Sequence, residues 1–414
     1  MKTAKQVRIA ADERSDKRSD KRSDERSDER PSEPVDHAAG MLTKTVMASP
    51  VTRRADYGQV VLVLQGGGAL GAYQAGVYEA LHVSGIEPDW VIGTSIGAIN
   101  AALIAGNDGS RRLERLRQFW SLVESPENWL SAFRGIGLGN TFANLSTVTR
   151  GIPAFFEPNP NAMFGTRFKV GAEQASYYST DPLRRTLAEL VDFAALAGGP
   201  TRLTVGAVNA CSGAMRYFDS RDEPLGVEHV MASGALPPAF PAVRIGADLY
   251  WDGGIYSNTP IEAVLDDYPR RSSLIFAVNV WHQTGPEPES IWEVMGRTKD
   301  IQYASRADNH IAKQKELHRM RHIVRELTAQ LSTEQRADPH IKELASWGCG
   351  TTMHVAHLAA PRLEGEDPTK DIDFTGTGVR LRREAGFTDT MRMIERSPWL
   401  APADAIEGVI EHRV

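Results

Sequence analysis

Two short apolar runs, each followed by a glycine-rich turn and a helical pattern, constrain the fold of this 414-residue chain more than any other feature. The first run is 60–64, and it leads into Gly66, Gly67, Gly68 and Gly71. The second run is 90–92, and it leads into Gly93-Thr94-Ser95-Ile96-Gly97. Short apolar runs bounded by glycines are typical of strands buried on both faces of a parallel sheet. Strand, turn and helix repeated in this order predict an α/β fold.

Further elements follow along the chain. We expect an amphipathic helix at 111–122, strands at 203–210, 215–219 and 274–281, a long charged helical segment at 291–331, a strand at 351–359 and a closing helix at 379–394. The chain therefore divides into a three-layer α/β/α domain at 60–265 and a mainly helical C-terminal extension at 283–414. The extension contains no catalytic pattern.

Residues 1–57 are expected to be a disordered low-complexity tail. Within it, residues 12–30 repeat an acid, Glu or Lys, Arg and Ser, with eight acids, seven bases and no apolar side chain to bury. Such a segment cannot offset the entropy lost on ordering. An arm that docks on a charged partner is the alternative interpretation.

Composition narrows the classes of function. The chain has 53 acidic and 47 basic side chains, a formal charge of −6, which argues against a nucleic-acid binder. Two cysteines and the lack of an apolar run long enough for a signal peptide or membrane span predict a cytoplasmic protein, with membrane contact at most peripheral. The sequence leaves the oligomeric state open.

The first glycine turn has the spacing G-x-G-x-x-G after a strand, which is the dinucleotide-binding fingerprint. That fold needs an acidic residue at the end of the second strand. Asp89 has about the right separation, but it precedes the second apolar run instead of ending it. A nucleotide-binding oxidoreductase therefore stays open as an alternative.

The second turn, residues 93–97, is G-x-S-x-G between a strand and a helix, the pattern of a nucleophile elbow. Gly93 and Gly97 leave room for the sharp turn that exposes Ser95, and the following helix directs free N–H groups at negative charge beside the serine. The first glycine run offers unobstructed N–H groups for an oxyanion. A serine hydrolase uses both turns, whereas a dinucleotide-binding protein uses only one.

A base for the serine is the remaining requirement. His282 and His229 are the candidates for a Ser-His-Asp arrangement, but neither has glycine neighbours. Asp252 instead ends a short apolar run and is followed by Gly253 and Gly254, which would allow it to approach the serine closely. His318 and His322 lie four residues apart without a third ligand, so we expect no metal site.

Four blocks together resemble the patatin-like phospholipase family: residues 66–71, 93–97, 232–241 and 252–254. The resemblance implies a patatin-like hydrolase fold and a Ser-Asp dyad, with Ser95 as nucleophile and Asp252 as proton acceptor. It also implies an oxyanion hole at Gly66, Gly67, Gly68 and Gly71, in which the N–H groups of Gly67 and Gly68 hold the oxyanion. No metal or cofactor is required.

One position departs from the family pattern. Many members have a basic residue before the last glycine of the first block, where this chain has Leu70. The missing charge favours a neutral ester, a lipid thioester or a hydroxyalkanoate oligomer over a phospholipid, and leaves acyl transfer open beside hydrolysis. A non-catalytic lipid-binding protein on the same fold is a further alternative.

Two other features have two interpretations each. Aromatic residues in the region 111–200 either belong to the core or line an acyl pocket or lipid surface; they are Trp129, Phe133, Phe142, Phe155, Phe156 and Phe164. The basic cluster 319–325 is either a solvated helix face or a contact for anionic lipid.

Overall fold

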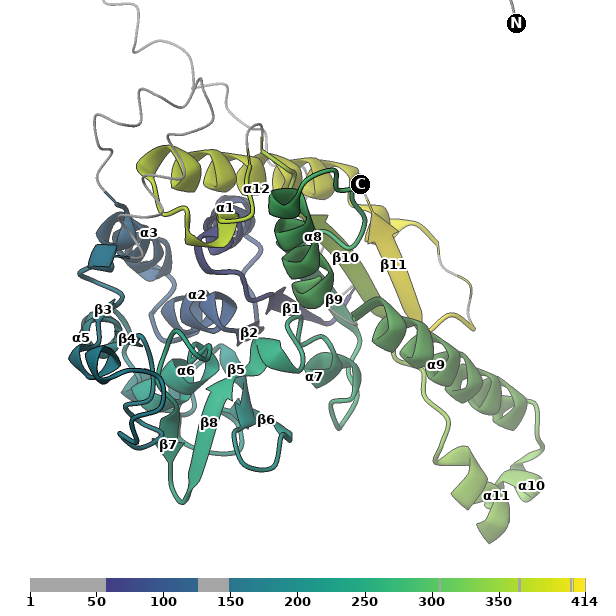
Figure 1. Cartoon of the computed structure of the whole chain (residues 1–414). Coiled ribbons are helices and arrows are strands. Elements are labelled where there is room, and N and C mark those ends of the chain that lie inside the picture. Colours follow the sequence, from purple (N-terminus) through teal and green to yellow (C-terminus); the bar gives the residue numbers. More distant parts are fainter. Residues whose placement is uncertain are drawn as a thin grey trace, which may run out of the picture. The chain divides into compact units, whose positions relative to one another are not determined.

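A mixed nine-stranded sheet forms the centre of the described part of the chain, which in the computed structural model comprises residues 57–125, 149–304, 307–363, 366–402, 404 and 406–413 (Figure 1). The predicted tail lies almost wholly outside these residues. In spatial order the strands are β11 (Val409–Arg413), β10 (Met353–Ala359), β9 (Ser273–Asn279), β1 (Gln59–Leu64), β2 (Trp90–Thr94), β5 (Arg202–Asn209), β8 (Asp248–Asp252) and β7 (Val243–Ile245), with β6 (Met215–Asp219) also paired to β5.

The strands from β11 to β5 run parallel, whereas β6 and β8 pair with β5 in the antiparallel direction and β7 pairs antiparallel with β8. A separate two-stranded ladder joins β3 (Glu157–Pro158) and β4 (Tyr178–Ser179). The helices are α1 (Ala72–Val83), α2 (Ile96–Ala105), α3 (Arg112–Val123), α5 (Asp181–Leu190), α6 (Val227–Ser233), α7 (Glu262–Leu265), α8 (Ile291–Tyr303), α9 (Ala307–Ala329), α10 (Thr333–Ala337), α11 (Pro339–Ala345) and α12 (Gly376–Arg396).

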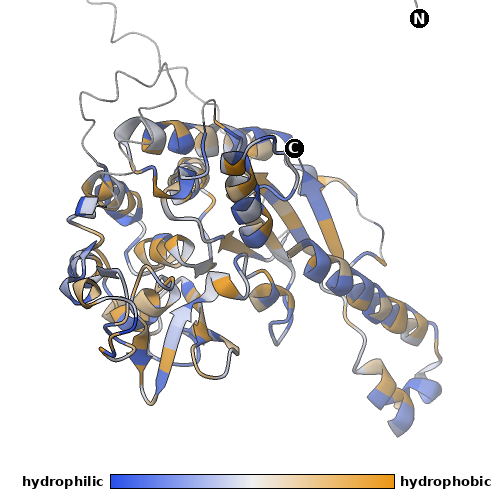
Figure 2. Ribbon diagram, viewed as in Figure 1, coloured by the Kyte–Doolittle hydropathy of each residue, from blue (hydrophilic) through white to orange (hydrophobic). Residues whose placement is uncertain are grey.

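Alternation along β1 divides the core between the two faces of the sheet. Val60, Leu62 and Leu64 belong to the larger hydrophobic cluster, which includes residues of α1, α2, α3 and α12. Val61 and Val63 belong to the smaller cluster, which includes residues of α7 and α9. Because helices cover both faces, the strand is apolar and buried from Val60 to Leu64, as its sequence predicts. The mixed hydrophilic and hydrophobic colouring of the helices in Figure 2 agrees with elements that bury one side only.

The predicted α/β fold class with a mainly helical C-terminal region is confirmed. The segment 291–331 is helical as predicted, and it consists of two helices, α8, which ends at Tyr303, and α9, which begins at Ala307. Side chains of Gln65 and Asn258 donate hydrogen bonds to the Tyr303 carbonyl at 3.1 and 2.8 Å, so the last turn of α8 is held by the segments that follow β1 and β8. Strand β11 had no predicted counterpart.

The aromatic residues of the region 111–200 separate into two groups where they are described. Phe155 and Phe156 are buried in the main cluster, and their rings contact Phe240 with centroids 6.1 and 5.4 Å away. Phe164 is exposed. Trp129, Phe133 and Phe142 lie outside the described residues. Among the described members of this group, the core interpretation therefore holds for Phe155 and Phe156 and fails for Phe164.

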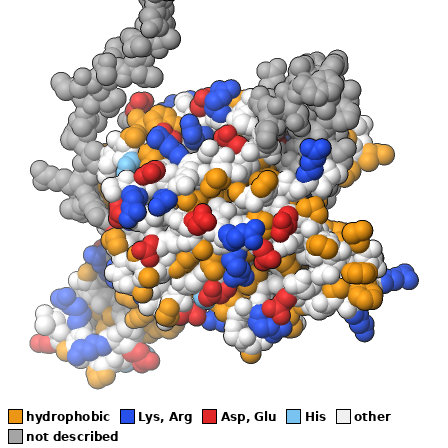
Figure 3. Space-filling model, turned by 90° about the vertical axis from the view of Figure 1, so that its left-hand side faces the viewer, with side chains coloured by type: hydrophobic (Ala, Val, Ile, Leu, Met, Phe, Trp, Pro, Cys, Tyr) orange, Lys and Arg blue, Asp and Glu red, His pale blue; other side chains and the backbone are white. Residues whose placement is uncertain are grey.

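No helix among the described residues combines the length and apolar character that a membrane crossing requires. On the face that carries α3 and α5, acidic and basic side chains are interspersed with hydrophobic ones (Figure 3). This described face presents no field of a single sign.

Candidate active site

The turn between β2 and α2 carries Ser95 at the carboxyl-terminal edge of the sheet. Ser95 has φ 57° and ψ −127°, and it is the N-cap residue of α2. A backbone of this kind costs a non-glycine residue about 1–3 kcal/mol and persists only where the surrounding structure imposes it. The N-terminus of α2, with its free N–H groups, consequently lies directly beside the serine side chain.

Two glycines make this turn possible. A Cβ on Gly93 would lie 2.2 Å from the carbonyl oxygen of Gly97, and a Cβ on Gly97 would lie 2.2 Å from the carbonyl oxygen of Leu64. Both contacts are with backbone, which cannot move aside cheaply. The close packing of β2, α2 and the end of β1 therefore explains why the sequence has glycine at each position.

Asp252, the last residue of β8, faces the serine. Ala207 of β5 pairs with Asp252 across the ladder, so the aspartate reaches the same edge of the sheet at which β2 ends. Its carboxyl group accepts a 2.7 Å hydrogen bond from the Gly254 N–H, and the Ser95 side chain lies close enough to lower its pKa. Gly253 cannot carry a side chain here, because a Cβ would lie 2.5 Å from the Gly206 carbonyl oxygen.

Burial controls the protonation of Asp252. The residue is 1% exposed, and this desolvation raises the pKa of its carboxyl group to about 7, although the Ser95 side chain and the hydrogen bond from Gly254 act in the opposite direction. A carboxylate with this pKa accepts a proton far more readily near neutral pH than an ordinary aspartate does. The group beside Ser95 is thus suited to act as a base.

Ser233 binds the backbone of the turn that carries Ser95, and the sequence patterns did not identify it. Its hydroxyl accepts a 3.1 Å hydrogen bond from the Ser95 N–H and donates a 2.6 Å bond to the Gly206 carbonyl. The side chain is fully buried at the end of α6. Ser233 lies in the block 232–241, one of the four that resemble the patatin-like family. That resemblance was the sequence signal that could have identified it.

The first glycine turn lies against the serine. A Cβ on Gly66 would be 3.0 Å from the Cβ of Ser95. The Gly66 N–H donates to the Asn258 carbonyl at 3.1 Å, while the Gly66 carbonyl accepts from Asn258 Nδ2 at 3.0 Å and from Trp281 Nε1 at 2.8 Å. Asn258 and Trp281 thereby fix the peptide next to the nucleophile. Neither was identified from the sequence.

The four glycines of this turn have different surroundings. Gly66 already donates its N–H, and Gly71 packs against Ile96, where a Cβ would lie 2.6 Å from a side-chain carbon. Within the described residues, the N–H groups of Gly67 and Gly68 have no acceptor. These two groups are therefore the ones available to bind an oxyanion.

A buried polar network holds the turn from behind. The Gln65 side chain accepts from the Val280 and Trp281 N–H groups at 2.6 and 3.0 Å and donates to Thr259 at 2.8 Å. Gln74 donates to the Gln65 carbonyl at 2.6 Å. Because each buried donor and acceptor has a partner, the network restricts the conformation of the loop.

The C-terminal region also contacts the turn. Gly68 has φ +55°, and a Cβ there would lie 2.2 Å from the Asp371 carbonyl oxygen, in the 3-10 turn Lys370–Ile372. Lys299 anchors this turn through an ion pair of 2.8 Å with Asp371. The extension is therefore part of the wall around the glycine turn.

The histidine candidates have other contacts. His229 Nδ1 bonds to the Gly226 N–H at 2.9 Å within the first turn of α6, and its ring packs on Phe218. Burial, followed by the charges of Lys370 and Arg362, lowers the pKa of His282 to about 4. Asp252, by contrast, is the titratable group whose pKa the Ser95 side chain influences.

Asp89 does not occupy the position that a dinucleotide-binding fold requires. Its carboxylate accepts from the Val60 N–H at 2.8 Å, and its carbonyl accepts from the Arg202 N–H at 2.8 Å. These bonds connect the amino-terminal ends of β1, β2 and β5, the edge opposite the glycine turns. The residue is a structural link there and lies away from the turn that would bind pyrophosphate.

Two family models match the chain. Residues 62–265 match the family described as "Patatin-like phospholipase", and residues 301–405 match a second family described as "Patatin phospholipase". No curated protein matches by sequence.

Several solved structures are similar. VipD from Legionella pneumophila is 16% identical, with 81% of this chain and 67% of that chain covered and a TM-score of 0.34. The type III effector protein ExoU is 12% identical, with 82% of this chain and 53% of that chain covered and a TM-score of 0.28. In the ExoU–SpcU complex from Pseudomonas aeruginosa the identity is 18%, the coverage 70% and 59%, and the TM-score 0.24. This chain spans about half the length of ExoU.

Proposed function

The chain belongs to the patatin-like phospholipase family of ester hydrolases, and on that premise we propose that it cleaves carboxylic ester bonds of lipids through Ser95 and Asp252. One observation carries the proposal: Asp252, a fully buried carboxylate whose pKa is raised to about 7 by burial, lies beside a serine in a strained turn at a helix N-terminus. Buried acids with shifted pKa values are characteristic of functional sites.

In the first half of the reaction, Ser95 Oγ attacks the ester carbonyl carbon while its proton passes to the Asp252 carboxylate. The carbonyl oxygen becomes an oxyanion. When the tetrahedral intermediate collapses, the bond to the alcohol breaks and the alcohol takes the proton from Asp252. In the second half, water attacks the acyl-enzyme and gives a proton to Asp252, which returns it to Ser95 as the acid leaves.

The oxyanion is the charge that the rest of the site has to stabilise. We assign this role to the N–H groups of Gly67 and Gly68, assisted by the N-terminus of α2. Asn258 and Trp281 contribute as positioning residues, because they hold the adjoining Gly66 peptide. In this mechanism Gly66 and Gly71 allow close packing and do not donate hydrogen bonds to the oxyanion.

The residue at position 70, Leu70, affects which substrate the site is expected to prefer. It is buried in the main hydrophobic cluster, so the basic side chain of many family members is replaced by core packing here. We propose a neutral acyl ester or thioester as the preferred substrate over a charged phospholipid. Transfer of the acyl group to an acceptor other than water requires no change in the residues assigned.

The test of this function is covalent labelling. A fluorophosphonate probe is expected to modify the wild-type protein at Ser95, because the probe reports a serine whose hydroxyl is activated by a base. Mass spectrometry of the digested protein should find the adduct on the peptide containing Ser95. Ser212→Ala, which changes an exposed loop serine, should label as well as wild type, and labelling of Ser95→Ala at an equal rate would contradict the proposal.

The pH dependence of activity follows from the same pKa. Asp252 must be ionised to accept the proton, so kcat/KM should increase tenfold per pH unit below about pH 7 and level off above it. Initial rates with a neutral nitrophenyl ester measure this profile. Asp248→Asn, an exposed aspartate on the same strand, should leave the midpoint unchanged. A wild-type profile that is flat from about pH 5 to pH 8 would show that another group is the base.

A further inference from the structure

The helix α8 has its polar and apolar sides in the reverse of the usual arrangement. Its only buried residue is Asp300. Because successive residues of an α-helix are about 100° apart, the side away from Asp300 is one continuous arc of about 120°. The residues on this arc are all exposed and none is charged: Ile291, Val294, Met295, Thr298, Ile301 and Gln302. Surface helices of soluble proteins normally bury their apolar side and expose the polar one.

The four apolar side chains of this arc form what we call the α8 apolar face: Ile291, Val294, Met295 and Ile301. They are between 48% and 84% exposed. The first three have the i, i+3, i+4 spacing that places side chains on one side of a helix, and Ile301 lies two turns after Val294. Contiguous exposed apolar patches mark interaction sites.

The opposite side of α8 is polar and attaches the helix to the protein. All the charged residues of the helix lie there: Glu293, Arg297, Lys299 and Asp300. Asp300 pairs with Lys370 at 2.8 Å, and Lys299 pairs with Asp371 at 2.8 Å. The charges of α8 are therefore used for contacts within the chain, and the apolar side remains in solvent.

This helix lies against the glycine turn of the candidate active site. The ring of Tyr303 packs on Trp281 with centroids 5.1 Å apart, and Trp281 donates to the Gly66 carbonyl at 2.8 Å. The Asp371 carbonyl oxygen would lie 2.2 Å from a Cβ on Gly68. A surface that binds the α8 apolar face therefore lies beside the turn that is assigned to the oxyanion.

Two further exposed apolar residues, Ile255 and Tyr256, follow shortly after Asp252. Asn258, two positions later, donates to the Tyr303 carbonyl at 2.8 Å, so this segment comes close to the C-terminal end of α8. The segment after the candidate base and the helix beside the glycine turn thus both present apolar side chains to solvent.

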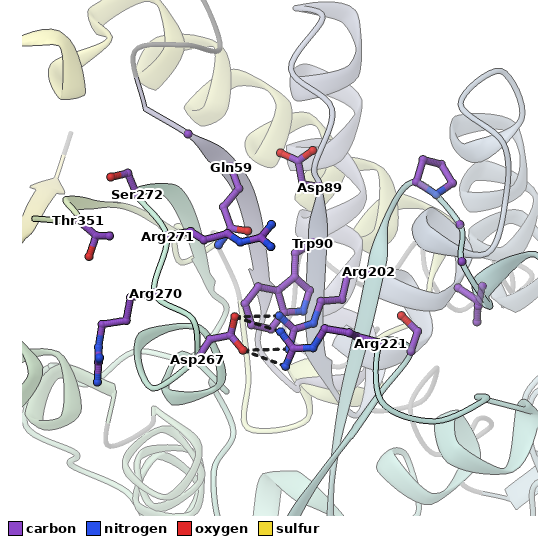
Figure 4. A pocket seen from close by; sticks show the side chains of 16 residues that line it. Gln59, Asp89, Trp90, Arg202, Arg221, Asp267, Arg270, Arg271, Ser272 and Thr351 are labelled. Carbon is purple, nitrogen blue, oxygen red and sulfur yellow. Dashed lines mark hydrogen bonds and ion pairs between the residues drawn. The ribbon is translucent and has the colours of Figure 1, made fainter. Parts of the chain in front are cut away.

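The opposite edge of the sheet has charged walls instead. A cavity of about 1010 Å³ there is lined by the first residues of β1, β2 and β5 (Figure 4). Within it Asp267 lies between Arg202 and Arg221, with ion pairs of 3.0 and 3.1 Å. Removing charged groups from water is costly. An apolar surface is therefore expected to approach the carboxyl-terminal edge, which carries Ser95.

The charges around the α8 apolar face favour an uncharged partner. Anionic membranes attract basic segments, and this arc has no basic residue. The exposed residues just before and at the start of α8 include three acids: Glu287, Glu289 and Glu293. These carboxylates would repel anionic headgroups.

A second copy of this chain is a poor match in size. The 13 residues of α8 make a face about 20 Å long and about 10 Å wide, on the order of 200 Å². A stable dimer buries about 800 Å² on each partner. A lipid surface sets no such minimum, because an amphipathic helix binds it in proportion to the apolar area inserted.

We propose that the α8 apolar face, together with Ile255 and Tyr256, docks the protein on the surface of a neutral ester lipid, so that the candidate active site lies at that surface. The identity of the partner rests on the proposed lipid esterase function. Insertion of the exposed side chains removes apolar area from water, which supplies the free energy of docking.

Flotation with triolein droplets coated with phosphatidylcholine tests the proposal. The Ser95→Ala protein is used throughout, so that no lipid is consumed. Its bound fraction should fall by about fivefold or more when Ile291→Gln and Met295→Gln are added, because two inserted side chains become polar. Ile291→Leu with Met295→Leu, at the same positions, should float as the parent does. No flotation of the parent, or equal flotation of the Gln and Leu variants, would overturn the proposal.

Two controls show that the effect belongs to this face. Both positions are exposed, so the melting temperatures of the Gln and Leu variants should agree within about 2 °C. Val83→Gln with Tyr268→Gln changes two exposed apolar residues near the amino-terminal edge of the sheet and should leave flotation unchanged. An equal loss in this variant would mean that docking does not use the α8 apolar face.

The other partners have results of their own. Binding to phosphatidylglycerol vesicles but not to droplets would replace the neutral lipid by an anionic membrane. A dimer in sedimentation that the Gln variant converts to a monomer would replace it by a second copy. Either result would overturn the proposal. Protein that a fluorophosphonate labels at Ser95 but that does not float would refute the docking alone and leave the esterase function standing.

Discussion

Replacement of Ser95 by alanine or Asp252 by asparagine is expected to lower kcat for a short-chain nitrophenyl ester by about 10³-fold or more. The first change removes the nucleophile. The second keeps an oxygen that can accept from the Gly254 N–H, so the geometry is retained while the base is lost. Initial rates with purified, folded protein measure both effects.

The two losses should not add. Because Asp252 acts only through the Ser95 hydroxyl, the double variant should be no slower than Ser95→Ala alone. Asp248→Asn and Ser212→Ala, both at exposed positions, are the matched controls and should keep nearly the wild-type rate. Near-full activity of Ser95→Ala, or a double variant slower by the product of both factors, would refute the dyad.

The turn that carries the nucleophile was predictable because all the residues that define it are close together in the sequence. Gly93, Ser95 and Gly97 lie within five residues, and each glycine is required by a backbone contact that a side chain would block. Alternating burial along β1 likewise follows from a run of five apolar residues. In such segments the spacing of residues in the sequence directly determines how they are arranged in space.

The supporting residues were not predictable in this way. Asn258 bonds to Gly66 across 192 positions, and Trp281 bonds to it across 215. A single polar side chain with a distant partner leaves no periodic pattern in the sequence. Asp252 became a candidate only because two glycines follow it, and its role as a base stays a prediction.

In the C-terminal region, some features of the fold were likewise not predictable from the sequence. Its helical character was evident, but the Tyr303 carbonyl at the end of α8 accepts hydrogen bonds from Gln65 and Asn258, which lie 238 and 45 positions earlier in the chain. Strand β11 has only the parallel neighbour β10 in its ladder, and its five residues include three charged or polar ones. Tertiary contacts, rather than local preference, determine both features.

Asp252→Asn is also expected to stabilise the protein at alkaline pH, although it removes activity. The folded pKa of about 7 lies above the unfolded value of about 3.9, so the folded state holds this proton more tightly. The aspartate therefore costs no stability below about pH 4, costs progressively more between the two pKa values, and costs the full amount above about pH 7.

At about 1.4 kcal/mol per pKa unit, the full cost is at most about 4 kcal/mol. Asparagine has no charge to desolvate, so Asp252→Asn should raise the melting temperature at about pH 8 by several degrees and change it little at about pH 4. Calorimetry at both pH values measures the difference, and Asp248→Asn should show no comparable dependence on pH. An aspartate retained at the expense of stability is the behaviour of a residue kept for chemistry. A variant that melts lower than wild type at about pH 8 would instead indicate that Asp252 is a structural group whose charge the fold stabilises.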